Sequence, residues 1–145
     1  MTLTIEIVES ATDEVRDALN SLVPQLSSRA VAIDNAKLAS IIENPSLTLL
    51  VARESGAILG TLTLAVFPIP SGEIAMIEDV VVDESARGLG AGEALVTAAI
   101  AHAASLGARE VDLTSRPSRK AANALYQKIG FEQRETNVYR FFIES

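Results

Sequence analysis

The chain has 145 residues, of which 48% are hydrophobic and 21% charged, and its formal net charge is −7 at pH 7. The length predicts a single domain over residues 1–145, and the apolar content excludes a disordered chain. With no cysteine and one histidine, the sequence excludes disulfides, thiolate or polyhistidine metal sites and a cysteine nucleophile, and its acidic charge argues against nucleic-acid binding.

The first half of the chain predicts a strand, two helices, a hairpin and a further strand. Leu3, Ile5 and Ile7 alternate as in a strand. Thr12 or Asp13 is expected to cap the first helix, and Pro45 to end the second. The predicted elements are a strand at 3–7, helices after Thr12 and after Asp34, hairpin strands at 47–53 and 57–66, and a strand at 73–82.

The second half predicts two helices and three strands after a glycine-rich loop. Gly107 is expected just past the end of the first of these helices. The predicted elements are a helix at 93–106, a strand at 109–114, a helix from Ser118 to Ile129, and strands at 131–134 and 136–142. This order predicts an α+β fold, with a central mixed, mostly antiparallel sheet flanked by about four helices.

No stretch of the sequence reaches the ~18 apolar residues of a membrane-spanning helix. The first residues have no basic region and alternate like a strand, so no signal peptide is predicted. The cytoplasm is therefore the expected location, with no membrane partner.

The segment Arg87–Gly92 (RGLGAG) lies between a predicted strand and a helix N-terminus. Three glycines so close together are costly in backbone entropy. They favour an anion cradle made of backbone N–H groups, with a tight strand-to-helix turn as the alternative. The P-loop pattern fails because no Lys follows the last glycine, and the dinucleotide pattern fails because Glu93 occupies its third glycine position.

Arg87, Gly90 and Gly92, directly after the apolar strand, resemble the R-x-x-G-x-G acyl-CoA loop of the GCN5-related N-acetyltransferase (GNAT) family. Residues 123–131 (NALYQKIGF) are similar to the second signature of that family, with a short gap between Asn and Tyr. The order of elements also matches, so the resemblance covers nearly the whole chain. It implies a GNAT-like fold and an enzyme that transfers the acetyl group of acetyl-CoA directly to an amine of a small molecule or peptide, through a ternary complex.

The resemblance also implies roles for individual residues. The strand before the loop would pair with pantetheine, the loop N–H groups would hold the pyrophosphate, and the N–H of Val80 could polarise the thioester carbonyl. Tyr126 would be the general acid for the leaving thiolate, and Asn123 would bind CoA. The residues implied in acetyl-CoA binding are Val80, Val81, Val82, Arg87, Gly88, Leu89, Gly90, Ala91, Gly92, Glu93, Asn123 and Tyr126.

Glu78 and Asp79 are the candidates for the base that takes a proton from the amine. Adjacent strand residues face opposite sides, so only one of them can face the cleft. The segment is similar to the corresponding strand of small-molecule members such as glucosamine-phosphate acetyltransferases. Glu78 is preferred because its side chain reaches further, and Asp79 or a water chain remain alternatives.

Other assignments stay open at this point. A non-catalytic acyl-CoA sensor on the same fold and a dinucleotide-binding module are the alternative functions. The resemblance implies that three segments of the chain determine which amine accepts the acetyl group. The acidic net charge slightly favours a cationic amine. A homodimer could form through an apolar edge strand at Val138–Ile143. The three segments are Ser21–Asn44, Phe67–Gly72 and Glu132–Thr136.

Overall fold

The computed structural model describes residues 2–144, and its contacts divide the chain into two compact units. The first unit ends at Thr114 and the second begins at Ser115. The first unit holds a five-stranded sheet in the order β1-β2-β3-β4-β5. Strands β1 to β4 pair antiparallel and β5 pairs parallel with β4, which confirms the expected mixed, mostly antiparallel sheet.

The helices begin and end where the sequence provides caps. Thr12 Oγ1 accepts a hydrogen bond from Val15 N at 3.2 Å, and Asp34 Oδ1 accepts one from Lys37 N at 2.8 Å, each satisfying an N–H that the helix leaves unpaired. Gly107 follows α3 with a φ of +90°, as expected. The elements are β1 (Leu3–Ile7), α1 (Asp13–Leu26), α2 (Asn35–Glu43), β2 (Leu47–Glu54), β3 (Ala57–Ile69), β4 (Gly72–Val82), the short 3-10 helix η1 (Glu84–Ala86), α3 (Ala91–Ser105) and β5 (Val111–Asp112) in the first unit, and α4 (Lys120–Ile129) in the second.

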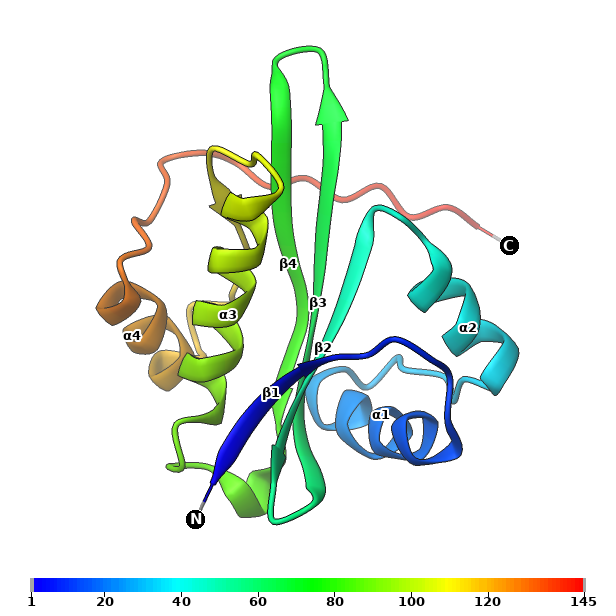
Figure 1. Ribbon diagram of the computed structural model, residues 1–145. Coiled ribbons are helices and arrows are strands. Elements are labelled where there is room, and N and C mark those ends of the chain that lie inside the picture. The colour runs from blue at the N-terminus through cyan, green and yellow to red at the C-terminus, as the bar shows by residue number, and fades with distance from the viewer. Residues whose placement is uncertain (1, 145) are drawn as a thin grey trace. The chain divides into compact units, whose positions relative to one another are not determined.

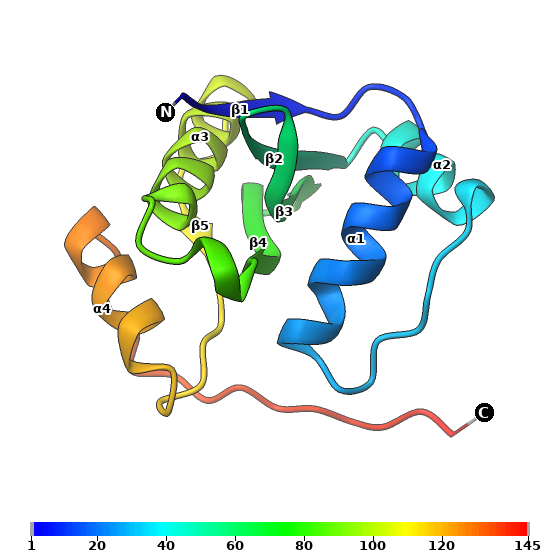
Figure 2. The ribbon, with the colours of Figure 1, turned by 90° about the horizontal axis from the view of Figure 1, so that it is seen from below.

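Helices cover both faces of the sheet in the first unit. Figures 1 and 2 show α1 and α2 on one face and α3 on the other. On the α1/α2 face, Val15, Leu19 and Leu38 pack with Leu49 of β2 in one buried cluster. On the other face α3 lies close to β3 at Gly60, where an added Cβ would come within 3.2 Å of Leu95 Cδ1. Helices therefore cover the middle of the sheet on both sides, whereas its edges and strand ends are less covered.

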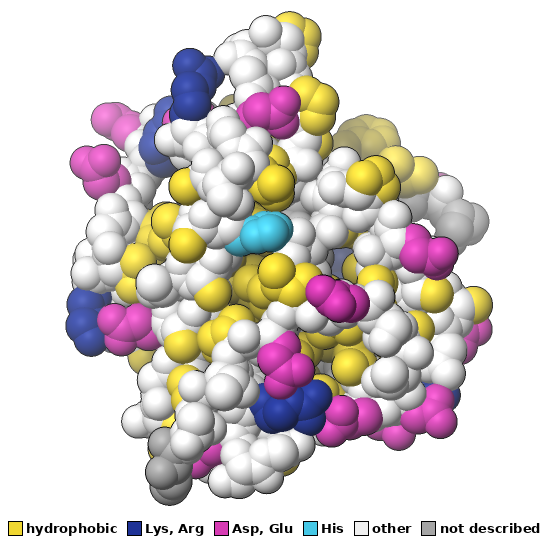
Figure 3. Space-filling model, in the orientation of Figure 1, with side chains coloured by type: hydrophobic (Ala, Val, Ile, Leu, Met, Phe, Trp, Pro, Cys, Tyr) yellow, Lys and Arg dark blue, Asp and Glu magenta, His cyan; other side chains and the backbone are white. Residues whose placement is uncertain are grey.

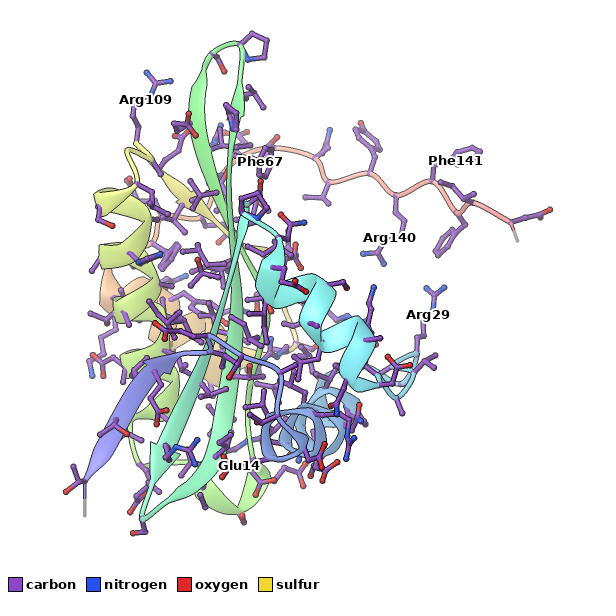
Figure 4. The ribbon with its side chains drawn as sticks, turned by 45° about the vertical axis from the view of Figure 1, so that its right-hand side comes forward. Glu14, Arg29, Phe67, Arg109, Arg140 and Phe141 are labelled. Atoms are coloured by element: carbon purple, nitrogen blue, oxygen red, sulfur yellow. The ribbon has the colours of Figure 1, made fainter. Side chains whose placement is uncertain are left out.

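Arg53 joins three elements at one end of the sheet. Its Nε donates to Glu6 of β1 at 2.7 Å, and its Nη1 donates to Glu14 of α1 and to the carbonyl oxygen of Gly56, both at 2.8 Å. The hydrogen bond from Arg53 is the main reason why the pKa of Glu14, labelled in Figure 4, is lowered. These groups are exposed to water, so the network fixes the arrangement of β1, α1 and the β2–β3 turn more than it adds stability.

The expected strands at 131–134 and 136–142 are absent, because residues 131–144 form no helix or strand. Their pattern has a high β-propensity, but a strand also needs a neighbour to pair its backbone groups, and no described strand pairs with them. The strand expected at 109–114 is only two residues long. Ser118 is not the cap of α4, which has Arg119 in that position without a side-chain hydrogen bond.

Within the described residues, no helix is long and apolar enough to cross a membrane. On the face seen in Figure 3, Lys and Arg side chains are scattered among acidic ones and form no continuous basic patch. This face is therefore unlike the basic footprint by which proteins bind nucleic acid.

Candidate functional site

Strand β4 is interrupted by a bulge at the residues that the sequence marked for chemistry. Thr63 of β3 pairs with Glu78, but Thr61 pairs with Val81, so two residues of β4 lie opposite the single residue between them on β3. One of these two, Asp79, has a φ of +50°, which costs energy for a residue other than glycine. Strain of this kind persists where the surrounding structure enforces it, and such positions cluster at functional sites.

The bulge decides which carboxylate faces which side. Glu78 is the register partner of Thr63, which pairs on its other side with Leu49, a member of the α1/α2 cluster. Residues paired across strands share a face, so Glu78 lies on the α1/α2 face of the sheet. Its side chain is exposed and makes no hydrogen bond or ion pair with another described residue. The Glu78 carboxylate is therefore accessible from that side of the sheet.

The edge of β4 that faces β5 is paired over only a short length. Ala75 pairs with Val111 and Met76 with Asp112, and no described strand pairs with this edge beyond Met76. The backbone groups that point to this edge between Ile77 and Val82 are therefore available to an extended ligand that carries amides. Val80, Val81 and Val82 lie along this open edge, and the side chain of Val81 is buried.

The glycine-rich loop joins the open edge of β4 to the N-terminus of α3. Gly88 and Gly90 have φ values of +89° and +84°, which side-chain-bearing residues rarely adopt, and a Cβ built at either meets nothing within 4 Å. Gly90 caps α3 without any side-chain hydrogen bond. The first-turn N–H groups of Ala91 and Gly92 have no acceptor within the helix, as at any helix N-terminus. Together with the helix dipole they form a site suited to an anion such as a pyrophosphate.

A side chain from α1 holds the start of this loop. Gln25 Nε2 donates to Asp83 Oδ1 at 2.8 Å, and Gln25 Oε1 accepts from the backbone N–H of Glu84 at 3.1 Å. Asp83 also accepts hydrogen bonds from the hydroxyl and the N–H of Ser85. These bonds, led by that from the Ser85 hydroxyl, lower the pKa of Asp83. One amide thus fixes both the carboxylate and the backbone where the loop leaves β4.

The second unit carries the other signature on α4. Tyr126 is buried, its ring meets that of Phe131 edge to face with 5.8 Å between centroids, and its hydroxyl makes no hydrogen bond with another described residue. Asn123 donates from Nδ2 to the carbonyl oxygen of Arg116 at 2.9 Å. The amide nitrogen of Asn123 thus supports the loop before α4, which leaves Oδ1 as its group for a ligand.

The remaining predicted residues of the acetyl-CoA site lie in or beside the loop. Arg87 and Leu89 are exposed, whereas Ala91 is buried. No group of three or more potential metal ligands occurs within the described residues.

Three features of the structure were not predicted from the sequence. The bulge at Asp79 could have been suspected, since two adjacent charged residues interrupt the alternation of apolar and polar residues in β4. No pattern in the sequence indicates the contact of Gln25 with Asp83, because these residues are 58 positions apart. Ser115 has a buried hydroxyl oxygen without a hydrogen-bond partner in the described structure. An unsatisfied buried oxygen costs free energy, which a ligand's donor or acceptor would recover.

Comparison with known proteins identifies the family of this chain. Residues 11–131 match the model of the Acetyltransferase (GNAT) family. An uncharacterised N-acetyltransferase of Methanocaldococcus jannaschii is 40% identical over 63 residues, which are 43% of this chain and only 28% of that relative.

Two solved structures are similar over nearly the whole chain. Glucosamine-6-phosphate N-acetyltransferase from Arabidopsis thaliana has a TM-score of 0.83 and 23% identity, covering 99% of this chain and 100% of the other. The aminoglycoside N-acetyltransferase AAC(6')-Iy, in a complex with a bisubstrate analogue, has a TM-score of 0.80 and 20% identity, covering 99% of both chains. At these identities the two structures support the fold. Together with the family match over residues 11–131, they establish that the chain belongs to the GNAT family of acetyltransferases.

Proposed function

We propose that this chain transfers the acetyl group of acetyl-CoA directly to a primary amine, within a ternary complex. The observation that carries the proposal is the open edge of β4 leading into a glycine loop at an uncapped helix N-terminus. The amides of pantetheine can pair with that edge, and the pyrophosphate can bind to the N–H groups of the loop. The structurally similar AAC(6')-Iy was solved in a complex with a CoA-based bisubstrate analogue, which supports a CoA site on this fold.

The proton transfers follow from the chemistry of amide formation. Glu78 accepts a proton from the amine, whose nitrogen then attacks the thioester carbonyl. The N–H of Val80, the second residue of the bulge, stabilises the developing oxyanion. The carbon–sulfur bond breaks, and the Tyr126 hydroxyl protonates the departing thiolate. The nitrogen, which still carries one proton too many for an amide, loses it to water, and the Tyr126 phenolate takes up a proton from water. Asp79 and a bound water are the alternative bases.

The acceptor amine would approach from the α1/α2 face of the sheet, because Glu78 lies on that face. The side chain of Asn20 holds the connection between α1 and α2 by two hydrogen bonds to the backbone of Ile33, at 3.0 and 2.9 Å. With a net charge of −7, we expect a cationic small-molecule amine to be preferred over an anionic one. The glucosamine-phosphate and aminoglycoside enzymes make amino sugars the first compounds to test.

The function is tested by binding and turnover with the full-length protein. Acetyl-CoA is expected to raise the melting temperature by a few degrees at saturation, whereas NAD and ATP leave it unchanged. Acetyl transfer is then measured over amino sugars, polyamines, amino acids and peptides. Stabilisation by acetyl-CoA without transfer to any amine would favour a non-catalytic sensor, and stabilisation by NAD alone would overturn the proposal.

Replacement of Glu78 tests the base. We expect Glu78→Gln to lower kcat/KM about 100-fold near neutral pH. The deficit should shrink as the pH approaches the amine's own pKa, near 10 for an alkyl amine, because the substrate then loses its proton without help. Asp79→Asn is the matched variant, and a larger loss there than in Glu78→Gln would assign the base to Asp79.

Replacement of Tyr126 tests the acid. Tyr126→Phe keeps the ring contact with Phe131 and removes only the hydroxyl, so acetyl-CoA binding is expected to persist while kcat falls about 100-fold. Tyr139→Phe, at the only other tyrosine, is the control and should retain full activity. An unchanged kcat in Tyr126→Phe would show that the thiolate takes its proton from elsewhere.

Gln25 acts in this scheme as a positioning residue for the acetyl-CoA loop. Gln25→Ala removes both hydrogen bonds that fix Asp83 and Glu84, and we expect the KM for acetyl-CoA to rise on the order of 10-fold with less than a twofold change in kcat. The KM for the amine should not change. Gln127→Ala, an exposed glutamine on α4, is the control. A loss confined to kcat, or an unchanged KM for acetyl-CoA, would remove Gln25 from this role.

A further inference from the structure

The two faces of the hairpin formed by β3 and β4 are covered to different extents. On the α3 face, Leu62 and Leu64 of β3 are fully buried, and Ala75 and Ile77 of β4 are at most 3% exposed. On the α1/α2 face, the apolar side chains near the hairpin turn are only partly buried. Figure 1 shows the reason, since the hairpin extends past the ends of α1 and α2. Part of the apolar sheet surface is therefore left open on this face.

The strand register defines this open surface, which we call the apolar strip. Thr63 and Glu78 are the pair already placed on the α1/α2 face, and the pairs that follow at intervals of two residues toward the turn share that face. Leu47 of β2 lies there too, as the partner of Ala65. Figure 4 shows Phe67 on the part of the hairpin beyond α2. The apolar strip consists of Leu47, Ala65, Phe67, Ile69, Ile74 and Met76.

Glu78 lies at one end of the apolar strip. With about 3.3 Å per residue along a strand, its Cα is roughly 7 Å from that of Met76 and roughly 13 Å from that of Ile74. The strip itself carries no charge, and Glu78 ends it with an exposed carboxylate. Apolar surface beside a single well-placed polar group is typical of small-molecule sites. This combination suits a ligand with a cationic head and an apolar body.

Within the first unit, helices occupy the other directions from Glu78 on this face. Toward the end of β4, Gln25 of α1 is hydrogen-bonded to Asp83 and to the N–H of Glu84. Toward β2, side chains of α1 and α2 cover Leu49 in the buried cluster. The apolar strip is the direction left for the body of an amine whose nitrogen lies at Glu78.

We propose that the acceptor is a primary amine with an apolar alkyl or aryl body, which lies on the apolar strip while its nitrogen faces Glu78. This inference rests on the proposed acetyl transfer and names its substrate class. Contact between the body and the strip removes apolar surface from water and so favours binding. An amino sugar would instead place hydroxyl groups against side chains that cannot pair with them, which costs free energy. The preferred acceptor therefore differs from the amino sugars named for the two structural relatives.

A series of acceptors tests the inference on the unaltered protein. Acetyl transfer from acetyl-CoA is measured with ethylamine, butylamine, hexylamine, phenylethylamine, glucosamine and spermidine. We expect kcat/KM to rise about fourfold for each CH2 group added along the alkyl series, and phenylethylamine to exceed glucosamine on the order of 10-fold. A flat series, or a higher kcat/KM for glucosamine or spermidine, would overturn this inference and leave acetyl transfer intact. If the protein binds acetyl-CoA but acetylates no amine, the proposed function fails and this inference fails with it.

Replacement of Phe67 tests the apolar strip itself. Threonine suits a strand but lacks the aromatic surface, so Phe67→Thr is expected to raise the KM for phenylethylamine about 10-fold and to leave the KM for acetyl-CoA unchanged. Phe67→Leu should recover most of the loss, because it restores apolar contact. Val66→Thr, on the opposite face of β3, is the matched control and should change neither KM. An unchanged KM for phenylethylamine in a Phe67→Thr protein with the native melting temperature would contradict the inference. Should Phe67→Thr lower the melting temperature, Phe67→Leu and the acceptor series decide the question.

Discussion

The divergence of β4 from β5 is the constraint on which the rest of the proposed site depends. A parallel pair that continued along the whole of β4 would use the backbone groups of that edge, and the edge could bind nothing. Pairing stops after Met76, and the bulge begins three residues later, at Asp79. Glu78, the valines of the open edge and the glycine loop then follow one another along one stretch of backbone. Under the proposed function this is the order of acetyl, pantetheine and pyrophosphate in the co-substrate, so one strand and its following loop would align the whole molecule.

Much of the first unit could be predicted from local sequence. The alternation of Leu3 to Ile7, the start of α1 at Thr12 or Asp13, the start of α2 after Asp34 and the glycine after α3 reflect interactions within a few residues. The structure confirms these predictions and assigns the first cap to Thr12. The antiparallel hairpin of β2 and β3 followed from a short turn between two apolar runs. The GNAT resemblance rested on two short motifs, and the family match over residues 11–131 confirms it.

The errors and omissions have a common physical cause, which is dependence on distant partners. The strands expected at 131–134 and 136–142 had suitable residues, yet no neighbouring edge in the described chain pairs with them. The Gln25 amide reaches a loop far along the sequence, and no periodicity records such a contact. The side of the sheet that Glu78 faces became known only from its register with Thr63. Roles for Glu78, Tyr126 and Asn123 remain predictions because they concern substrates rather than the fold.

The uncapped N-terminus of α3 has a consequence for turnover under the proposed function. Its N–H groups would contact the pyrophosphate, which is identical in acetyl-CoA and in CoA, so this part of the binding free energy does not distinguish substrate from product. Interactions that bind both equally do not accelerate the chemical step. Released CoA would then compete for the same loop with nearly undiminished affinity. An enzyme built in this way responds to the ratio of acetylated to free CoA around it, and its rate reports the acetylation state of that pool as well as the amount of amine.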